Sequence, residues 1–129
     1  MSILGSMQVG GYFDKPTILI STIVRGLLWK SRTGLITTNG IKMHVATAGE
    51  GPPIVLLCHG FPESWYSWRH QLKALAKAGY CAVAPDMRGY GQTDKPEAID
   101  QYTPLHLTGD MVGLVEAFGF KEAVIVGHL

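Results

Sequence analysis

The sequence predicts an α/β fold, in which a β-hairpin is followed by a parallel βαβαβ sheet with flanking helices. Three observations lead to this fold class: an Asn-Gly pair between two β-prone runs, three later apolar runs of strand length, and two amphipathic segments that alternate with those runs. Strands that alternate with amphipathic helices favour a parallel sheet covered on both faces, joined by right-handed crossover connections.

The hairpin is expected at Asn39-Gly40, because residues 35–38 and 42–47 on either side are rich in β-prone side chains. A two-residue type I′ turn needs positive φ at both central positions, and Asn-Gly tolerates this conformation best. We therefore expect two antiparallel strands that meet at this pair.

Three apolar runs that follow suit strands buried on both faces: residues 54–58, 80–85 and 123–126. A first helix is predicted over residues 63–79 from an apolar stripe that recurs every three or four residues: Trp65, Trp68, Leu72 and Leu75. A second helix is predicted to begin at Thr103-Pro104, an N-cap residue followed by proline at the first helical position. Its apolar face consists of Leu107, Met111, Leu114, Val115 and Phe118. Gly109 in its middle is expected to weaken it by about 1 kcal/mol relative to alanine.

The length of 129 residues and the 47% hydrophobic content suit one domain with a real core. We expect this core domain over residues 35–129, preceded by an extension over residues 1–34 that is partly disordered or helical. The apolar segment 17–29 falls short of the ~20 residues of a spanning helix and contains Arg25, so a membrane span is not expected. An interfacial or targeting helix stays open as the alternative.

Charge and cysteine usage exclude several partner classes. Eleven Lys and Arg against ten Asp and Glu give a net charge of +1, so no nucleic-acid partner is expected. The histidines lack metal-ligand spacing, and neither a metal nor a cofactor is expected. Cys58 and Cys81 lie inside apolar runs, which suits reduced thiols and a cytoplasmic location. Asp110 and Glu116 are interpreted as solvated residues of a helix face.

The most informative stretch is His59-Gly60-Phe61-Pro62, which directly follows the first buried strand. Ligand sites of open α/β sheets lie at the carboxyl ends of the strands. A turn at this edge can aim the backbone N–H of Phe61 at a developing oxyanion, while the Phe61 ring forms an apolar wall for a substrate. The alternative that these four residues only shape a turn stays open.

Three stretches in this order, CHGFPESWYSWRHQL, APDMRGYGQTDKP and VIVGH, resemble the soluble epoxide hydrolases of the α/β-hydrolase superfamily. The resemblance covers residues 35–128 and implies the N-terminal half of an α/β-hydrolase fold. It implies that residues 59–62 form the oxyanion turn, in which the proline is usually cis. It also implies that Asp86 and Arg88 brace a glycine-rich loop, a structural role that is common for charged turn residues.

In this family Gly127 and His128 correspond to the first two positions of the nucleophile turn. Epoxide hydrolases place an aspartate next, because a carboxylate can open the strained ring to give an ester that is later hydrolysed. This sequence has Leu129 at that position. Leucine has no nucleophilic atom, and the family's general-base histidine, its orienting acid and the cap-domain tyrosines come later than residue 129.

The chain is therefore interpreted as an incomplete and inactive copy of an epoxide hydrolase, whose full-length form takes a small apolar substrate. Two other interpretations stay open: a haloalkane dehalogenase, serine esterase or perhydrolase of the same superfamily, and a non-catalytic binding or regulatory fragment. Residues 123–126 are also expected to form an open, apolar sheet edge that favours self-association.

Overall fold

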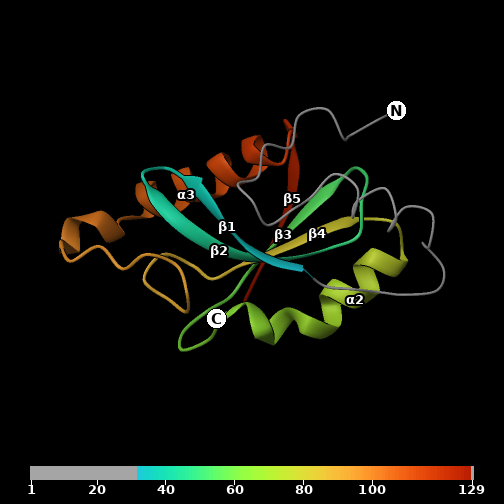
Figure 1. The fold of residues 1–129 in the computed structure, drawn as a ribbon, viewed down its shortest axis with the longest axis horizontal. Helices are drawn as coiled ribbons and strands as arrows, with labels where there is room; N and C mark the ends of the chain where they lie inside the picture. The colour runs from blue at the N-terminus through green and yellow to red at the C-terminus, as the bar shows by residue number, and fades with distance from the viewer. Residues whose placement is uncertain (1–31, 129) are drawn as a thin grey trace.

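A computed structural model describes residues 32–128 and shows one five-stranded sheet with the strand order β1-β2-β4-β3-β5 (Figure 1). The expected features of residues 1–31 and the side chain of Leu129 lie outside the described residues. No helix among residues 32–128 is both long enough and apolar enough to cross a membrane.

The N-terminal hairpin is confirmed. Strand β1 (Arg32–Thr38) pairs antiparallel with β2 (Ile41–Ala48), with Thr38 opposite Ile41 across the turn. Asn39 and Gly40 have φ values of 46° and 77°, as a type I′ turn requires. Strand β1 begins at Arg32, somewhat earlier than the run that predicted it.

The three buried runs form β3 (Ile54–Cys58), β4 (Cys81–Pro85) and β5 (Ala123–Gly127), all parallel to one another. Strand β2 pairs antiparallel with β4, so the hairpin extends the parallel part into a mixed sheet. Because β3 lies between β4 and β5, the carboxyl ends of all three parallel strands meet at one edge of the sheet.

The first helix is shorter than predicted. Residues 65–68 form a 3-10 helix, η2 (Trp65–Trp68), and the α-helix α2 covers Arg69–Lys77. The first N–H groups of a helix have no partner within it, and here side chains satisfy two of them: Ser64 Oγ accepts from the N–H of Tyr66, and the Asp86 carboxylate accepts from that of Trp65.

The second helix, α3 (Pro104–Ala117), begins as predicted, with Thr103 Oγ1 accepting from the backbone N–H of His106 at 3.4 Å. A short 3-10 helix, η3 (Ile99–Tyr102), precedes it. Helix α3 contains two glycines, Gly109 and Gly113, that allow it to pack closely against the hairpin. A Cβ at Gly109 would lie 2.8 Å from Asn39 Nδ2, and a Cβ at Gly113 would overlap Thr38 Oγ1.

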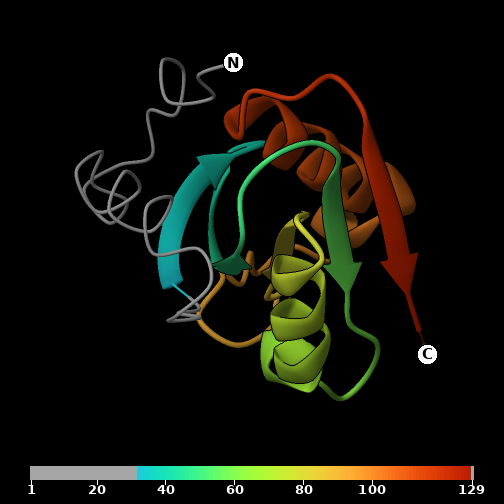
Figure 2. The same ribbon diagram turned by 90° about the vertical axis from the view of Figure 1, so that its right-hand side faces the viewer.

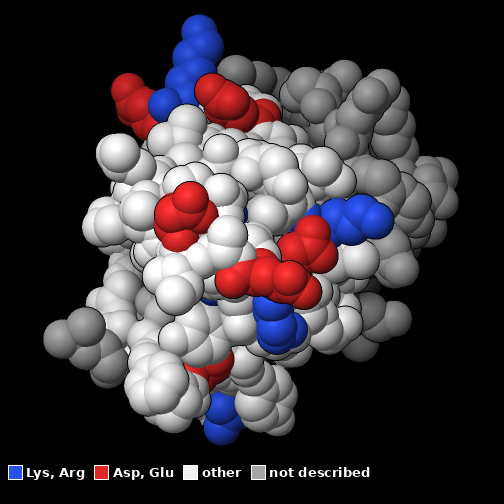
Figure 3. All heavy atoms as spheres, turned by 90° about the vertical axis from the view of Figure 1, so that its left-hand side faces the viewer, with Lys and Arg blue, Asp and Glu red and all other residues white. Residues whose placement is uncertain are grey.

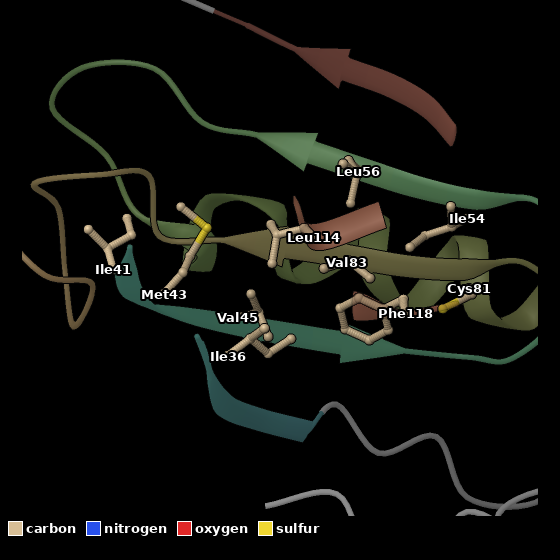
Figure 4. Close-up of a cluster of buried hydrophobic side chains, with 10 residues drawn as sticks. All are labelled: Ile36, Ile41, Met43, Val45, Ile54, Leu56, Cys81, Val83, Leu114 and Phe118. Carbon is tan, nitrogen blue, oxygen red and sulfur yellow. The ribbon is translucent and has the colours of Figure 1, made fainter. Parts of the chain in front are cut away.

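Helices α2 and α3 lie on opposite faces of the sheet, as expected (Figure 2). Successive side chains of a strand point to opposite faces, so Leu56 lies in the core under α3 and Leu57 in the core under α2. The buried side chains on the α3 face (Figure 4) are Ile36, Ile41, Met43, Val45, Ile54, Leu56, Cys81, Val83, Leu114 and Phe118. Those on the α2 face are Ala46, Ala48, Val55, Leu57, Trp68, Leu72, Ala82 and Ala84.

Candidate functional site at the carboxyl edge of the sheet

Three segments meet where the parallel strands end: the turn 59–62 after β3, the loop 86–94 after β4, and Gly127-His128 at the end of β5. The register of β3 and β5 places Cys58 beside Gly127, so the first and third segments leave the sheet side by side. Sequence reasoning singled out all three segments, and the fold brings them to one edge.

His59 links the first two segments. Its imidazole is buried, Nε2 accepts a hydrogen bond from the backbone N–H of Met87 at 2.9 Å, and Nδ1 lies 2.8 Å from the carbonyl oxygen of Gly60. A backbone N–H can only donate and a carbonyl can only accept, so the ring carries its proton on Nδ1. Both nitrogens are thereby used, and His59 ties the turn to the β4 loop rather than serving as a free base.

Phe61 lies at the outer point of the turn. Its peptide bond to Pro62 is cis, and its side chain is 79% exposed. The turn is closed by a hydrogen bond from the backbone N–H of Glu63 to the carbonyl oxygen of Gly60, at 3.2 Å. Within residues 32–128 no hydrogen bond uses the backbone N–H of Phe61. This N–H is therefore a donor at the sheet edge without an acceptor among the described groups.

Asp86 is almost fully buried, and its carboxylate accepts three hydrogen bonds. Oδ1 accepts from the backbone N–H of Trp65 at 2.9 Å, while Oδ2 accepts from the backbone N–H of Gln92 at 3.1 Å and lies 2.9 Å from His44 Nδ1. Gly91, with φ of 50°, packs against this carboxylate so closely that any Cβ would overlap it. Because these hydrogen bonds occupy both oxygens, Asp86 has a structural role: it joins strand β2, the start of η2 and the loop after β4.

Arg88, in the loop after β4, forms a buried ion pair with Asp110 of α3. Its Nε and one terminal nitrogen donate to the two carboxylate oxygens at 2.9 and 2.7 Å. Asn39 completes the group, donating from Nδ2 to Asp110 Oδ1 at 2.8 Å. The hydrogen bonds to Asp110 raise the pKa of the Arg88 guanidinium above its ordinary value, so the guanidinium stays charged.

The interpretation of Asp110 as a solvated residue is wrong, because its side chain is completely buried. Its position on α3 faces the hairpin tip, and only the tertiary fold brings Arg88 to it. Glu116, on the same helix, is exposed as expected.

His128, at the end of β5, reaches back to the segment after the turn. Its Nε2 lies 3.0 Å from Glu63 Oε2, and its ring meets that of Trp68 edge-on, with centroids 4.8 Å apart. Sequence reasoning did not anticipate the contact to Glu63, since only the neighbouring register of β3 and β5 brings these residues together. The same holds for His44 on β2, whose partner Asp86 directly follows β4.

Cys58 is the last residue of β3, and its Sγ lies 3.4 Å from Met111 Sδ. Burial raises the pKa of the Cys58 thiol, which keeps it protonated and poorly nucleophilic. Among residues 32–128 no group of three histidine, cysteine, aspartate or glutamate side chains could hold a metal ion.

Residues 53–128 match the family model described as alpha/beta hydrolase fold. The chain belongs to this family. Curated proteins similar to this alpha/beta hydrolase chain include several epoxide hydrolases. Epoxide hydrolase 3 of Siraitia grosvenorii is 58% identical over 93 residues, which cover 72% of the chain and 29% of the relative. Epoxide hydrolase A of Mycobacterium tuberculosis is 56% identical over 95 residues, covering 73% and 30% of the two chains.

Solved structures of epoxide hydrolases have the same fold as this chain. A crystal structure of an epoxide hydrolase from Vigna radiata superimposes with a TM-score of 0.71 at 56% identity, over 78% of this hydrolase chain and 30% of the other. Epoxide hydrolase A from Mycobacterium thermoresistibile gives a TM-score of 0.75 at 46% identity, over 77% and 31% of the two chains. The fold predicted from the sequence, the N-terminal half of an α/β-hydrolase, is thus confirmed. The chain spans less than a third of the length of these relatives.

Proposed function

We propose that this chain supplies the oxyanion turn of an epoxide hydrolase, including one N–H donor that stabilises the oxyanion. The complete enzyme converts small apolar epoxides to diols through an alkyl-enzyme ester. The observation that carries the proposal is the backbone N–H of Phe61. It has no acceptor among the described residues, and it belongs to the turn beside Gly127-His128 at the carboxyl edge. The epoxide hydrolases among the relatives support the same reaction.

In the proposed reaction, a carboxylate oxygen in the position after His128 attacks a ring carbon of the epoxide. The ring C–O bond breaks, and its oxygen takes a proton from an acid of the cap domain. Water then gives a proton to the family's general-base histidine and attacks the ester carbonyl, and the Phe61 N–H stabilises the negative charge on that carbonyl oxygen. Collapse of this intermediate breaks the bond between the ester carbonyl and the alkyl oxygen, which takes the proton from the histidine to leave as the diol. The remaining carboxyl proton returns to the cap acid, which restores the carboxylate.

We further propose that a polypeptide of these 129 residues does not turn over epoxides by itself. The residue at the nucleophile position is Leu129, and a hydrocarbon side chain cannot form the ester. We also propose a reducing, cytoplasmic location, because Cys58 and Cys81 are both free thiols.

A pair of hybrid proteins tests these proposals. In the first hybrid, residues 35–128 replace the matching segment of Siraitia grosvenorii epoxide hydrolase 3, so that every later residue comes from the relative. We expect it to hydrolyse an aryl epoxide such as styrene oxide, with kcat within about tenfold of the parent enzyme.

The second hybrid is the matched control. It differs only in carrying residues 35–129, which places Leu129 at the nucleophile position, and we expect no turnover above background. A folded but inactive first hybrid contradicts the assignment of the oxyanion turn. Turnover by the second hybrid contradicts the proposed role of position 129.

A further inference from the structure

We propose that Asp86 is a positioning residue for the oxyanion turn: its buried carboxylate fixes where the Phe61 N–H stands. This proposal rests on the proposed function of that N–H. It assigns to Asp86 an effect on catalysis that acts through the turn, without contact to the substrate.

The turn is held from both sides by the loop after β4. Before Phe61, the ring of His59 accepts the backbone N–H of Met87 at 2.9 Å. After Phe61, the backbone N–H of Trp65 donates to Asp86 Oδ1 at 2.9 Å. Both of these hydrogen bonds end on adjacent residues, Asp86 and Met87. The segment that carries the oxyanion donor is therefore clamped to a single point at the end of β4.

The clamp is rigid because the Asp86 carboxylate is itself fixed. The imidazole of His44 on β2 and the backbone N–H of Gln92 both bind Oδ2, which leaves Oδ1 for Trp65. The backbone of Asp86 is anchored as well, since its N–H donates to the carbonyl oxygen of His44 at 2.8 Å and its carbonyl oxygen accepts from Thr93 Oγ1 at 2.6 Å.

Only a carboxylate satisfies this arrangement. Three donors converge on two oxygens that carry no hydrogen, whereas an asparagine of the same shape offers one acceptor oxygen and an NH₂ group that can only donate. Asp86→Asn therefore keeps the volume of the side chain but sets its NH₂ group against at least one of the donors. We expect the residues between His59 and Trp65 to move or loosen.

The consequence for catalysis follows from geometry. An oxyanion donor acts at a separation of 2.7–3.1 Å from the developing charge, and its contribution falls steeply when it is displaced. Such a loss slows the hydrolysis of the ester and not the alkylation step that precedes it. The expected signature is a fall in kcat with little change in kcat/KM, so that KM falls together with kcat.

The experiment uses the first hybrid enzyme with Asp86→Asn, compared with Asp110→Asn. The Asp110 carboxylate is equally buried, and it binds Arg88 and Asn39 but nothing in the turn. Both variants lose buried hydrogen bonds, so both are expected to melt at lower temperature. We expect kcat to fall by about 10- to 100-fold in Asp86→Asn, with kcat/KM within about twofold, and by less than about threefold in Asp110→Asn.

Amide hydrogen exchange of the same proteins provides a readout that does not depend on turnover. Exchange over residues 60–65 should accelerate at least about tenfold in Asp86→Asn and stay near the parent rate in Asp110→Asn. If the parent hybrid is inactive, the proposed function fails while this measurement still decides the role of Asp86. Equal acceleration in both variants, or a loss of kcat that follows thermal stability alike in both, overturns the proposal.

Discussion

At the scale of single residues, burial determines which side chains of this chain can react. Asp86, Arg88 and Asp110 are each at most 2% exposed, and each is hydrogen-bonded to several groups. Buried charges are tolerated only with such partners, and partners that satisfy a charge also suppress its reactivity. Among the described residues, Trp68 Nε1 is a buried donor without a partner, and its ring lies against His128.

The two thiols follow the same rule. Cys81 opens β4 inside the α3-face core, where burial, with a smaller contribution from the Glu50 carboxylate, raises the pKa of its thiol to about 12. The ordinary pKa of a cysteine thiol is 9.0. Below pH 9 the thiol is protonated in both the folded and the unfolded chain, so its full contribution to stability is present.

We therefore expect alkaline pH to destabilise the fold through Cys81. As the pH rises from 9 towards 12, the unfolded chain loses this proton while the folded chain keeps it, so the free energy of unfolding falls, by at most on the order of 4 kcal/mol. Denaturant titrations from pH 8 to 11 in reducing buffer should show a shallower decline for Cys81→Ala than for the parent chain. Identical slopes would show that this thiol does not contribute.

At the scale of elements, the contact between α3 and the β1-β2 hairpin decides why the helix contains glycine. Glycine lowers helix propensity, and no local sequence pattern explains why Gly109 or Gly113 stands inside the helix. In the fold both glycines face the hairpin tip, with Gly113 against Thr38 and Gly109 against Asn39. The absence of a Cβ lets the helix approach closely enough for Asn39 to reach Asp110.

Gly113→Ala tests this explanation, because the two arguments predict opposite signs. Propensity alone predicts stabilisation by about 1 kcal/mol. The fold predicts destabilisation by about 1–3 kcal/mol, because the new methyl group overlaps Thr38 Oγ1. Denaturant titration measures the difference. The double variant Thr38→Ala/Gly113→Ala should recover part of the loss, and a stabilised single variant would refute the close contact.

At the scale of the whole molecule, the sheet formed by residues 32–128 ends on an open strand. Within these residues, strand β5 pairs with β3 on one side only and forms the edge of the sheet in Figure 2. Its exposed apolar side chains are Val124, Ile125 and Val126, at 48%, 56% and 37% exposure. On the face drawn in Figure 3, in contrast, acidic and basic side chains are interspersed.

We expect the 129-residue polypeptide, when produced alone, to self-associate through β5, because an unpaired apolar edge binds other strands. Ile125→Lys should reduce this association by placing a charge on the edge. Leu105→Lys is the control, since Leu105 is 83% exposed on α3, away from the edge. Sedimentation velocity over a concentration series measures the outcome. A monodisperse parent chain, or equal improvement by both variants, contradicts the prediction.

The sequence alone determined most of the fold. The turn at Asn39-Gly40, the cap at Thr103 and the strands β3 to β5 follow from local rules, because φ preferences, capping and continuous apolar runs are properties of a few adjacent residues. The motifs at 59–62, 86–91 and 127–128 were also found from the sequence, since a parallel sheet collects strand ends at one edge.

Tertiary structure alone decided which side chains are partners. The burial of Asp110, the pairing of His44 with Asp86 and the contact of Glu63 with His128 each join residues far apart in the chain. Such contacts depend on strand order and register, which no local pattern encodes. The physical reason is that a charged side chain can be buried only beside an opposite charge or hydrogen-bond partners. These partners come from distant parts of the chain, so the sequence alone predicts a solvated residue.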